Sequence, residues 1–112
     1  MITGLQKKVD EIVLLLVEGK FAEIETLTNG TRLPAEQIKT AVSQYGRTLV
    51  LPPAEVFSLI DVIQIRNASP ASWSITMPLW TKEEGRSDLT LELTLIQEAC
   101  GFKVELDDIH VL

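Results

Sequence analysis

The sequence has 112 residues, 46% of them hydrophobic and 23% charged, which is the balance of one ordinary globular domain and excludes a disordered chain. Sixteen acidic and ten basic side chains give a net charge of −6, which repels phosphate backbones and excludes nucleic acid as the expected partner. The single Cys100 cannot form an internal disulfide, and the apolar run at 12–17 is too short for a signal peptide or membrane span, so we expect a cytoplasmic protein without membrane attachment.

Apolar residues at helical spacing predict three helices within the first 46 residues. Over 5–18 the apolar stripe is so wide that we expect this helix to be buried on more than one side. A second, shorter helix begins at Phe21 and stops at Asn29 and the glycine after it. A third follows Pro34, which has no amide hydrogen to lose at a first helical position, and is closed by Gly46.

Strand-like alternation replaces the helical period after a Pro-Pro pair that interrupts regular structure. The first candidate strand alternates around Ile63 and Ile65, and Pro78 in the second belongs at a sheet edge or a bulge because it cannot donate to a ladder. The connections are short, so an antiparallel meander is expected rather than parallel crossovers. The four candidate strands are 61–67, 72–80, 89–96 and 102–112.

This order of elements predicts one α+β domain over 1–112, with a helical part at 1–46 and a mainly antiparallel sheet at 47–112. The helices are expected to pack on one sheet face. Trp73 and Trp80 differ in parity, so one should lie in the core and the other near the second face or the open end of the curved sheet. That second face is expected to be partly apolar and to serve as a homodimer or partner surface, because four apolar residues fall out of step with their strands: Trp80, Ile96, Ile109 and Val111.

Two stretches, "LLLVEGKFAEIETL" and "LWTKEEGRSDLTLELTL", resemble the helical entry and the long central hairpin of the nuclear-transport-factor-two-like superfamily, also called cystatin-like or SnoaL-like. The resemblance implies three N-terminal helices packed on a strongly bent, cone-shaped antiparallel sheet. It does not select a function, because that fold serves isomerases, dehydratases, hydrolases, ligand binders and interaction modules. Enzymes of the superfamily place Asp and His side chains inside the cone, which implies here either a carboxylate with His110 or carboxylates alone.

The C-terminal stretch "VELDDIHVL" allows more than one interpretation. In a regular strand, Asp108 and His110 share the core face and could act as general base and acid, joined by Asp61 and Glu92 from neighbouring strands. Alternatively, a β-bulge at Asp107 and Asp108 shifts the register so that the apolar residues stay in the core and His110 points outward. The apolar pattern favours the bulge. A partner-contact role for the acidic pair is the third possibility.

The sequence therefore predicts a small non-enzymatic interaction or ligand-binding module, dimeric through its sheet face. The alternative is a SnoaL-like isomerase, dehydratase or hydrolase of a small apolar substrate that uses Asp108 and His110, and a further alternative is an immunity-type protein that binds a toxin domain. No cofactor and no metal are expected, because the chain offers one histidine and one cysteine where zinc sites usually take several. The expected pocket or interface residues are Asp61, Trp73, Trp80, Glu92 and Asp107.

Overall fold

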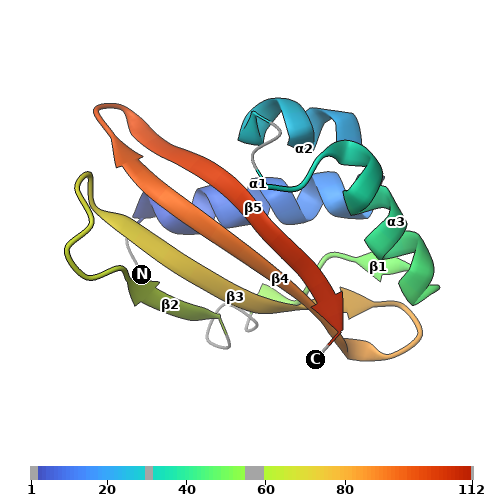
Figure 1. The fold of residues 1–112 in the computed structure, drawn as a ribbon. Helices are drawn as coiled ribbons and strands as arrows, with labels where there is room; N and C mark the ends of the chain where they lie inside the picture. The colour runs from blue at the N-terminus through green and yellow to red at the C-terminus, as the bar shows by residue number, and fades with distance from the viewer. Residues whose placement is uncertain (1–2, 30–31, 55–59, 112) are drawn as a thin grey trace.

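The computed structural model describes residues 3–29, 32–54 and 60–111 and shows an α+β fold with the helices first and the sheet second (Figure 1). This confirms the predicted fold class, and the antiparallel sheet is open. No helix within these residues is long and apolar enough to cross a membrane. The elements are α1 (Thr3–Glu18), α2 (Phe21–Thr28), α3 (Ala35–Tyr45), β1 (Leu49–Val50), β2 (Asp61–Gln64), β3 (Ser72–Thr81), β4 (Gly85–Glu98) and β5 (Gly101–Val111).

The three helices end where the sequence predicts. Asn29 and Gly46, which follow α2 and α3, take left-handed backbone angles with φ of 57° and 72°. A left-handed residue cannot continue a right-handed helix, so each one stops its helix within one residue. Gly19, with φ of 73°, makes the same kind of break after α1.

The sheet is the predicted antiparallel meander of β2, β3, β4 and β5, with β1 added along β3. The sequence did not predict β1, because two residues are too few to show alternation. Pro78 lies at a register shift of β3 against β4 and, on the other side, in the gap between the pairings of β2 and β1. The missing amide hydrogen of Pro78 therefore costs little, as the sequence predicted.

The core lies between the helices and one sheet face, and in Figure 1 α1 runs behind the strands. Trp73 is a core residue, and its ring meets that of Phe102 edge to face at 5.6 Å between centroids. Helix α1 approaches this pair closely, since a Cβ on Gly4 would lie 2.6 Å from the Phe102 ring. Because residue 4 is a glycine, α1 can pack closely against the Phe102 ring.

One prediction about burial is wrong. Helix α1 buries one broad face only, and Leu14 on its other side is 41% exposed. In β2, Val62 faces the core, because it pairs with the fully buried Ile75. Strand alternation then turns Ile63 and Ile65 away from the core, and they are 64% and 39% exposed.

Strand β5 contains the bulge that the apolar pattern favoured. Glu92 pairs with Asp108 but its neighbour Leu93 pairs with Leu106, which leaves Asp107 as an extra residue. Ile109 is consequently buried in the core. The regular-strand alternative, with Asp108 and His110 on the core face, is wrong.

The same bulge changes which apolar residues lie on the second face. Ile109 and Val111 pair with Leu91 and Leu89, which face the helices, so both belong to the helical side, although Val111 at the strand end is 55% exposed. Only two of the four out-of-step apolar residues, Trp80 and Ile96, remain on the second face. Ile63 and Ile65, which point away from the core, lie on that face as well, so it is partly apolar but with a different set of residues from the one that the sequence indicated.

The acidic hairpin between β3 and β4 is tied to the chain that follows α3. The Glu83 carboxylate accepts bonds from the backbone N–H and the hydroxyl of Thr48, at 2.8 and 2.9 Å. Tyr45 donates its hydroxyl to Glu84 at 2.8 Å. These bonds hold the hairpin over the end of α3.

Deleting one residue of β5 tests the bulge. We expect deletion of Asp107 to keep the fold at a cost of about 1–2 kcal/mol, because a regular strand then still places Leu106 and Ile109 in the core and only polar contacts of Asp107 are lost. Deletion of Glu105, the matched control, should cost about 3 kcal/mol or more, since either Val104 or Leu106 must then leave the core. Urea unfolding measures both values. Equal costs for the two deletions would contradict the assignment of Asp107 as the extra residue.

Candidate functional site

The sheet face opposite the helices, called here the open face, carries a row of side chains at one level of the strands. Asp61 on β2 pairs with Thr76 on β3, Thr76 pairs with Glu92 on β4, and Glu92 pairs with Asp108 on β5. Paired residues point to the same side of a sheet, so these four lie in line across four strands. Three of the four are carboxylates, and we call Asp61, Glu92 and Asp108 the acidic row.

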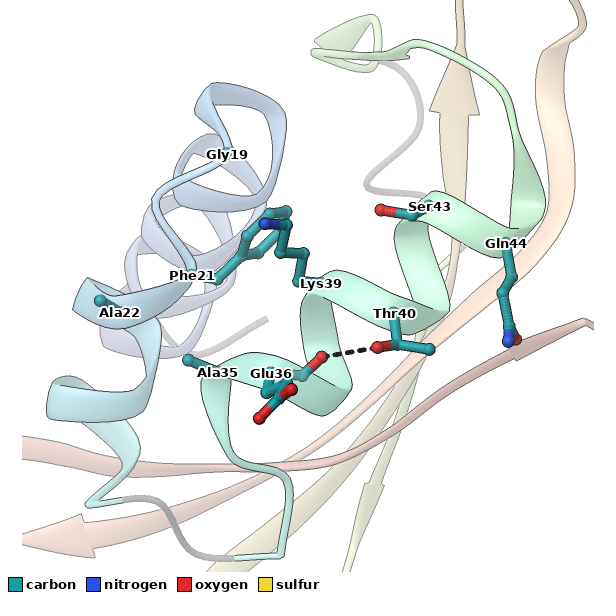
Figure 2. Close-up of a pocket in the computed structure, with 9 residues that line it drawn as sticks. All are labelled: Gly19, Phe21, Ala22, Ala35, Glu36, Lys39, Thr40, Ser43 and Gln44. Atoms are coloured by element: carbon teal, nitrogen blue, oxygen red, sulfur yellow. Dashed lines mark hydrogen bonds between the residues drawn. The ribbon is translucent and has the colours of Figure 1, made fainter.

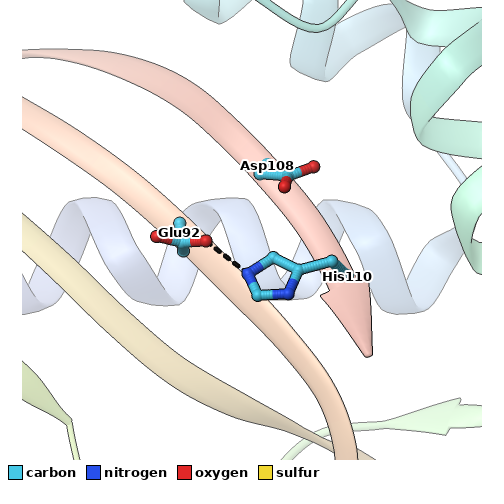
Figure 3. A group of neighbouring side chains, drawn as sticks. All are labelled: Glu92, Asp108 and His110. Atoms are coloured by element: carbon cyan, nitrogen blue, oxygen red, sulfur yellow. Dashed lines mark hydrogen bonds and ion pairs between the residues drawn. The ribbon is translucent and has the colours of Figure 1, made fainter. Parts of the chain in front are cut away.

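His110 joins the acidic row from the next level of β5, where it pairs with Thr90. Its ring reaches from β5 toward β4, and its Nε2 hydrogen-bonds Oε2 of Glu92 (Figure 3). One donor atom each from Glu92, Asp108 and His110 lies within 4.8 Å of the other two. Asp108 is further oriented by the Ile109 N–H, which donates to its Oδ1 at 2.9 Å.

The carboxylate of Glu92 makes His110 more basic. Its hydrogen bond to the ring raises the pKa of His110 above the ordinary 6.5, and the nearby charge of Asp108 adds to this, whereas partial burial works in the opposite direction. The His110 and Glu92 side chains are 35% and 39% exposed, so water screens the pair. The cluster therefore favours a positive charge on the ring while staying accessible to solvent.

Asp107, the bulge residue, does not join this cluster. Its Oδ2 accepts a bond of 2.6 Å from the Thr94 hydroxyl, and Arg32 Nε lies 2.9 Å from Oδ1. The Arg32 N–H does not point at Oδ1, so that contact is a charge pair without an aligned hydrogen bond. Burial raises the pKa of Asp107 more than Thr94 and Arg32 lower it. Since Arg32 comes from the connection between α2 and α3, Asp107 links the helical layer to the edge strand.

Shallow hollows surround the cluster and the helices. Two grooves between α3 and β5, of about 270 and 370 Å³, are bordered by Asp108 and His110 respectively. A hollow of about 160 Å³ on the open face is lined by Asp61, Thr76 and Arg86 among others. Figure 2 shows a wider groove of about 750 Å³ between α3 and the start of α2, where Glu36 and Lys39 are the charged residues. That wider groove beside α3 also contains the acid Glu36 and the hydroxyls of Thr40 and Ser43, but the imidazole and the carboxylates near it lie on the open face and its β5 edge.

The structure brings together some of the predicted site residues and separates others. Asp108, His110 and Glu92 are neighbours, whereas β3 lies between Asp61 and Glu92. Trp73 is in the core, and Trp80 is half-buried on the opposite side of its strand from the buried Leu79.

The direct partner of the imidazole is Glu92, which the sequence indicated as a residue that could join Asp108 and His110, without placing it in contact with the ring. This contact depends on the register of β4 against β5, which only the bulge fixes. Aligning the apolar residues of the two strands in the sequence could have revealed this register and, with it, the contact between Glu92 and His110.

The Glu92–His110 pair can hold a proton and release it to a group bound on the open face. Because Asp108 and His110 point outward, they do not form the enclosed acid/base pair that the resemblance implies. An acid/base role for them stays a prediction.

The His110 pKa tests this electrostatic account. We expect Glu92→Gln to lower it toward 6.5 and Asp108→Asn to lower it less, because the hydrogen bond from Glu92 is the first cause of its increase. A raised folded-state pKa stabilises the fold fully below the unfolded pKa of about 6.5 and loses that effect as pH rises through the folded pKa. The stability difference between wild type and Glu92→Gln should thus be largest in mild acid, at less than about 1 kcal/mol for so exposed a pair.

NMR titration of the ring, unambiguous with one histidine, and unfolding at pH 5.5–8.5 measure these effects. Glu98→Gln, a loss of the same charge at the far end of β4, is the control. An unchanged His110 pKa in Glu92→Gln would refute the assignment of the pair.

No curated protein and no solved structure matches this sequence, so the resemblance to the nuclear-transport-factor-two-like superfamily stays a prediction. A family model described as "Domain of unknown function (DUF7668)" matches residues 13–112, which include α2, α3, all five strands and the whole acidic row. The chain therefore belongs to the DUF7668 family.

Proposed function

We propose that this protein is a non-enzymatic binding module whose open face binds a partner protein through basic groups on that partner. The proposal rests on the acidic row. In this row, the pairing of neighbouring strands aligns three carboxylates across the sheet. Among the described helices none covers this face (Figure 1). Because the paired strands already fix the backbones of these residues, binding has to order only their side chains, which favours their use in recognition.

The neighbouring residues fit contact with a protein. Thr76 lies in the acidic row between Asp61 and Glu92, and the paired Ser74 and Thr94 lie two residues further along their strands. These side chains are short, so the middle of the open face is accessible to a partner. Ile63, at 64% exposure, is on the same face, since it pairs with Ser74. A mixture of exposed apolar residues, hydroxyls and charges is the usual composition of a non-obligate interface.

Charge favours a basic partner over a second copy of the chain. Beside the acidic row, the described part of this face also carries Glu105 and Asp88 against Lys103 and Arg86. Two copies stacked through it would bring carboxylates toward carboxylates, and the chain as a whole has a net charge of −6. The homodimer expected from the sequence therefore stays a prediction, and it is the competing outcome in the experiment below. A reducing cytoplasmic location is part of the proposal, supported by the exposed free Cys100.

A triple substitution tests the acidic row. Asp61→Asn with Glu92→Gln and Asp108→Asn should weaken binding of a decalysine peptide at least about tenfold at low salt, since three nearby charges are lost. The control, Glu18→Gln with Glu23→Gln and Glu36→Gln, removes the same total charge from the helices and should weaken binding about threefold or less. Chemical shifts of backbone amides report both the affinity and the position of the peptide.

Equal weakening by the two triple variants would contradict the proposal, because binding would then follow net charge alone. Self-association is measured in parallel by sedimentation velocity. A wild-type dimer that Thr76→Arg converts to a monomer would replace the basic partner with a second copy of the chain.

A further inference from the structure

We propose that Glu92, Asp108 and His110 form a binding site for a divalent cation of the zinc class on the open face. The proposal does not depend on the partner protein inferred above. Sequence alone gave no reason to expect a metal, because its one histidine and one cysteine are far too few for the common zinc sites. The register of β4 against β5 adds two carboxylates to that histidine.

The positions of the donor atoms fit such a cation. Zinc takes nitrogen and carboxylate oxygen ligands at about 2.0–2.2 Å, which places two ligands of a tetrahedral ion about 3.4 Å apart. The three donor atoms here lie within 4.8 Å of one another. Rotation of side chains that are more than one-third exposed can close the remaining gap, while the paired backbones of β4 and β5 stay in place.

The charges and donor types select the class of cation. Two carboxylates carry the charge that neutralises a divalent ion, and a neutral imidazole completes three ligands. Mg²⁺ and Ca²⁺ prefer oxygen ligands throughout, so the imidazole favours zinc and its first-row neighbours. Three ligands from one open face leave a fourth position for water or for a side chain of a bound protein.

Two contacts already orient the donors. The Ile109 N–H occupies Oδ1 of Asp108, which leaves Oδ2 to face a ligand, and hydrogen bonding of this kind orients carboxylate ligands in metal sites. Nε2 of His110 and Oε2 of Glu92 point toward each other, so a cation between them takes the place of the proton that they share. When the ring is protonated, that proton passes to solvent as the nitrogen lone pair binds the cation.

Titration with zinc chloride tests the site in the full chain. All variants carry Cys100→Ser, because the exposed thiol could bind zinc by itself. We expect zinc to shift the His110 ring signals, and Glu92→Gln, Asp108→Asn and His110→Asn each to weaken the affinity measured by calorimetry at least about tenfold. Asp61→Asn, which removes a carboxylate of the same row one strand beyond Thr76, should change the affinity less than about twofold.

The proposal is overturned if millimolar zinc leaves the His110 signals unchanged. It is also overturned if Asp61→Asn weakens binding as much as Asp108→Asn, because zinc would then be attracted by diffuse charge. Core methyl signals confirm that each variant is folded, and three independent ligand variants keep the test decisive if one of them is not. Binding of decalysine is measured without zinc, so failure of either proposal leaves the other intact.

Discussion

One extra residue in the last strand determines which side chains this protein offers to its surroundings. With Asp107 accommodated as a bulge, Leu106 and Ile109 both remain in the core, and Asp108 and His110 both leave it. Compared with a regular strand, the bulge adds the burial of Ile109, worth about 1.5–3 kcal/mol, and keeps the Asp108 carboxylate out of the core; together these outweigh the lost ladder pairing. The chemistry of the open face is therefore a consequence of packing on the other face.

The bulge also solves a problem of the sheet edge. Strand β5 has β4 on one side only, and an unprotected edge strand can pair with other chains. A bulge and charged side chains both discourage such pairing. Here the charged bulge residue is bound from the helical layer by Arg32 and from β4 by Thr94. Asp107 thus forms the bulge and places a charge at the sheet edge. It also contacts Arg32, which lies between α2 and α3.

On the open face, a proton, a metal cation and a basic side chain would all use the same electrostatic feature. Glu92 lies between Thr76 and Asp108 in the row and beside His110, so its carboxylate can stabilise positive charge on the ring or on a bound group. Any cation bound there competes with the proton on Nε2. The exposure of the pair keeps each such interaction weak by itself, and a partner that covers the face would strengthen all of them by removing water.

The sequence by itself determined the elements. Helical and strand periods differ, and glycine, asparagine and proline mark their ends, so the helices, four of the five strands and the position of Pro78 could be read from local patterns. The sequence also indicated the bulge, because regular alternation through Asp107 and Asp108 would place Ile109 and Val111 opposite the core. Only the tertiary structure decided that Glu92 meets His110, that Asp61 lies one strand too far away, and that Ile63 points outward. These facts depend on the register between strands and on which face the helices cover, and both are set by contacts between residues distant in the sequence, which no local pattern contains.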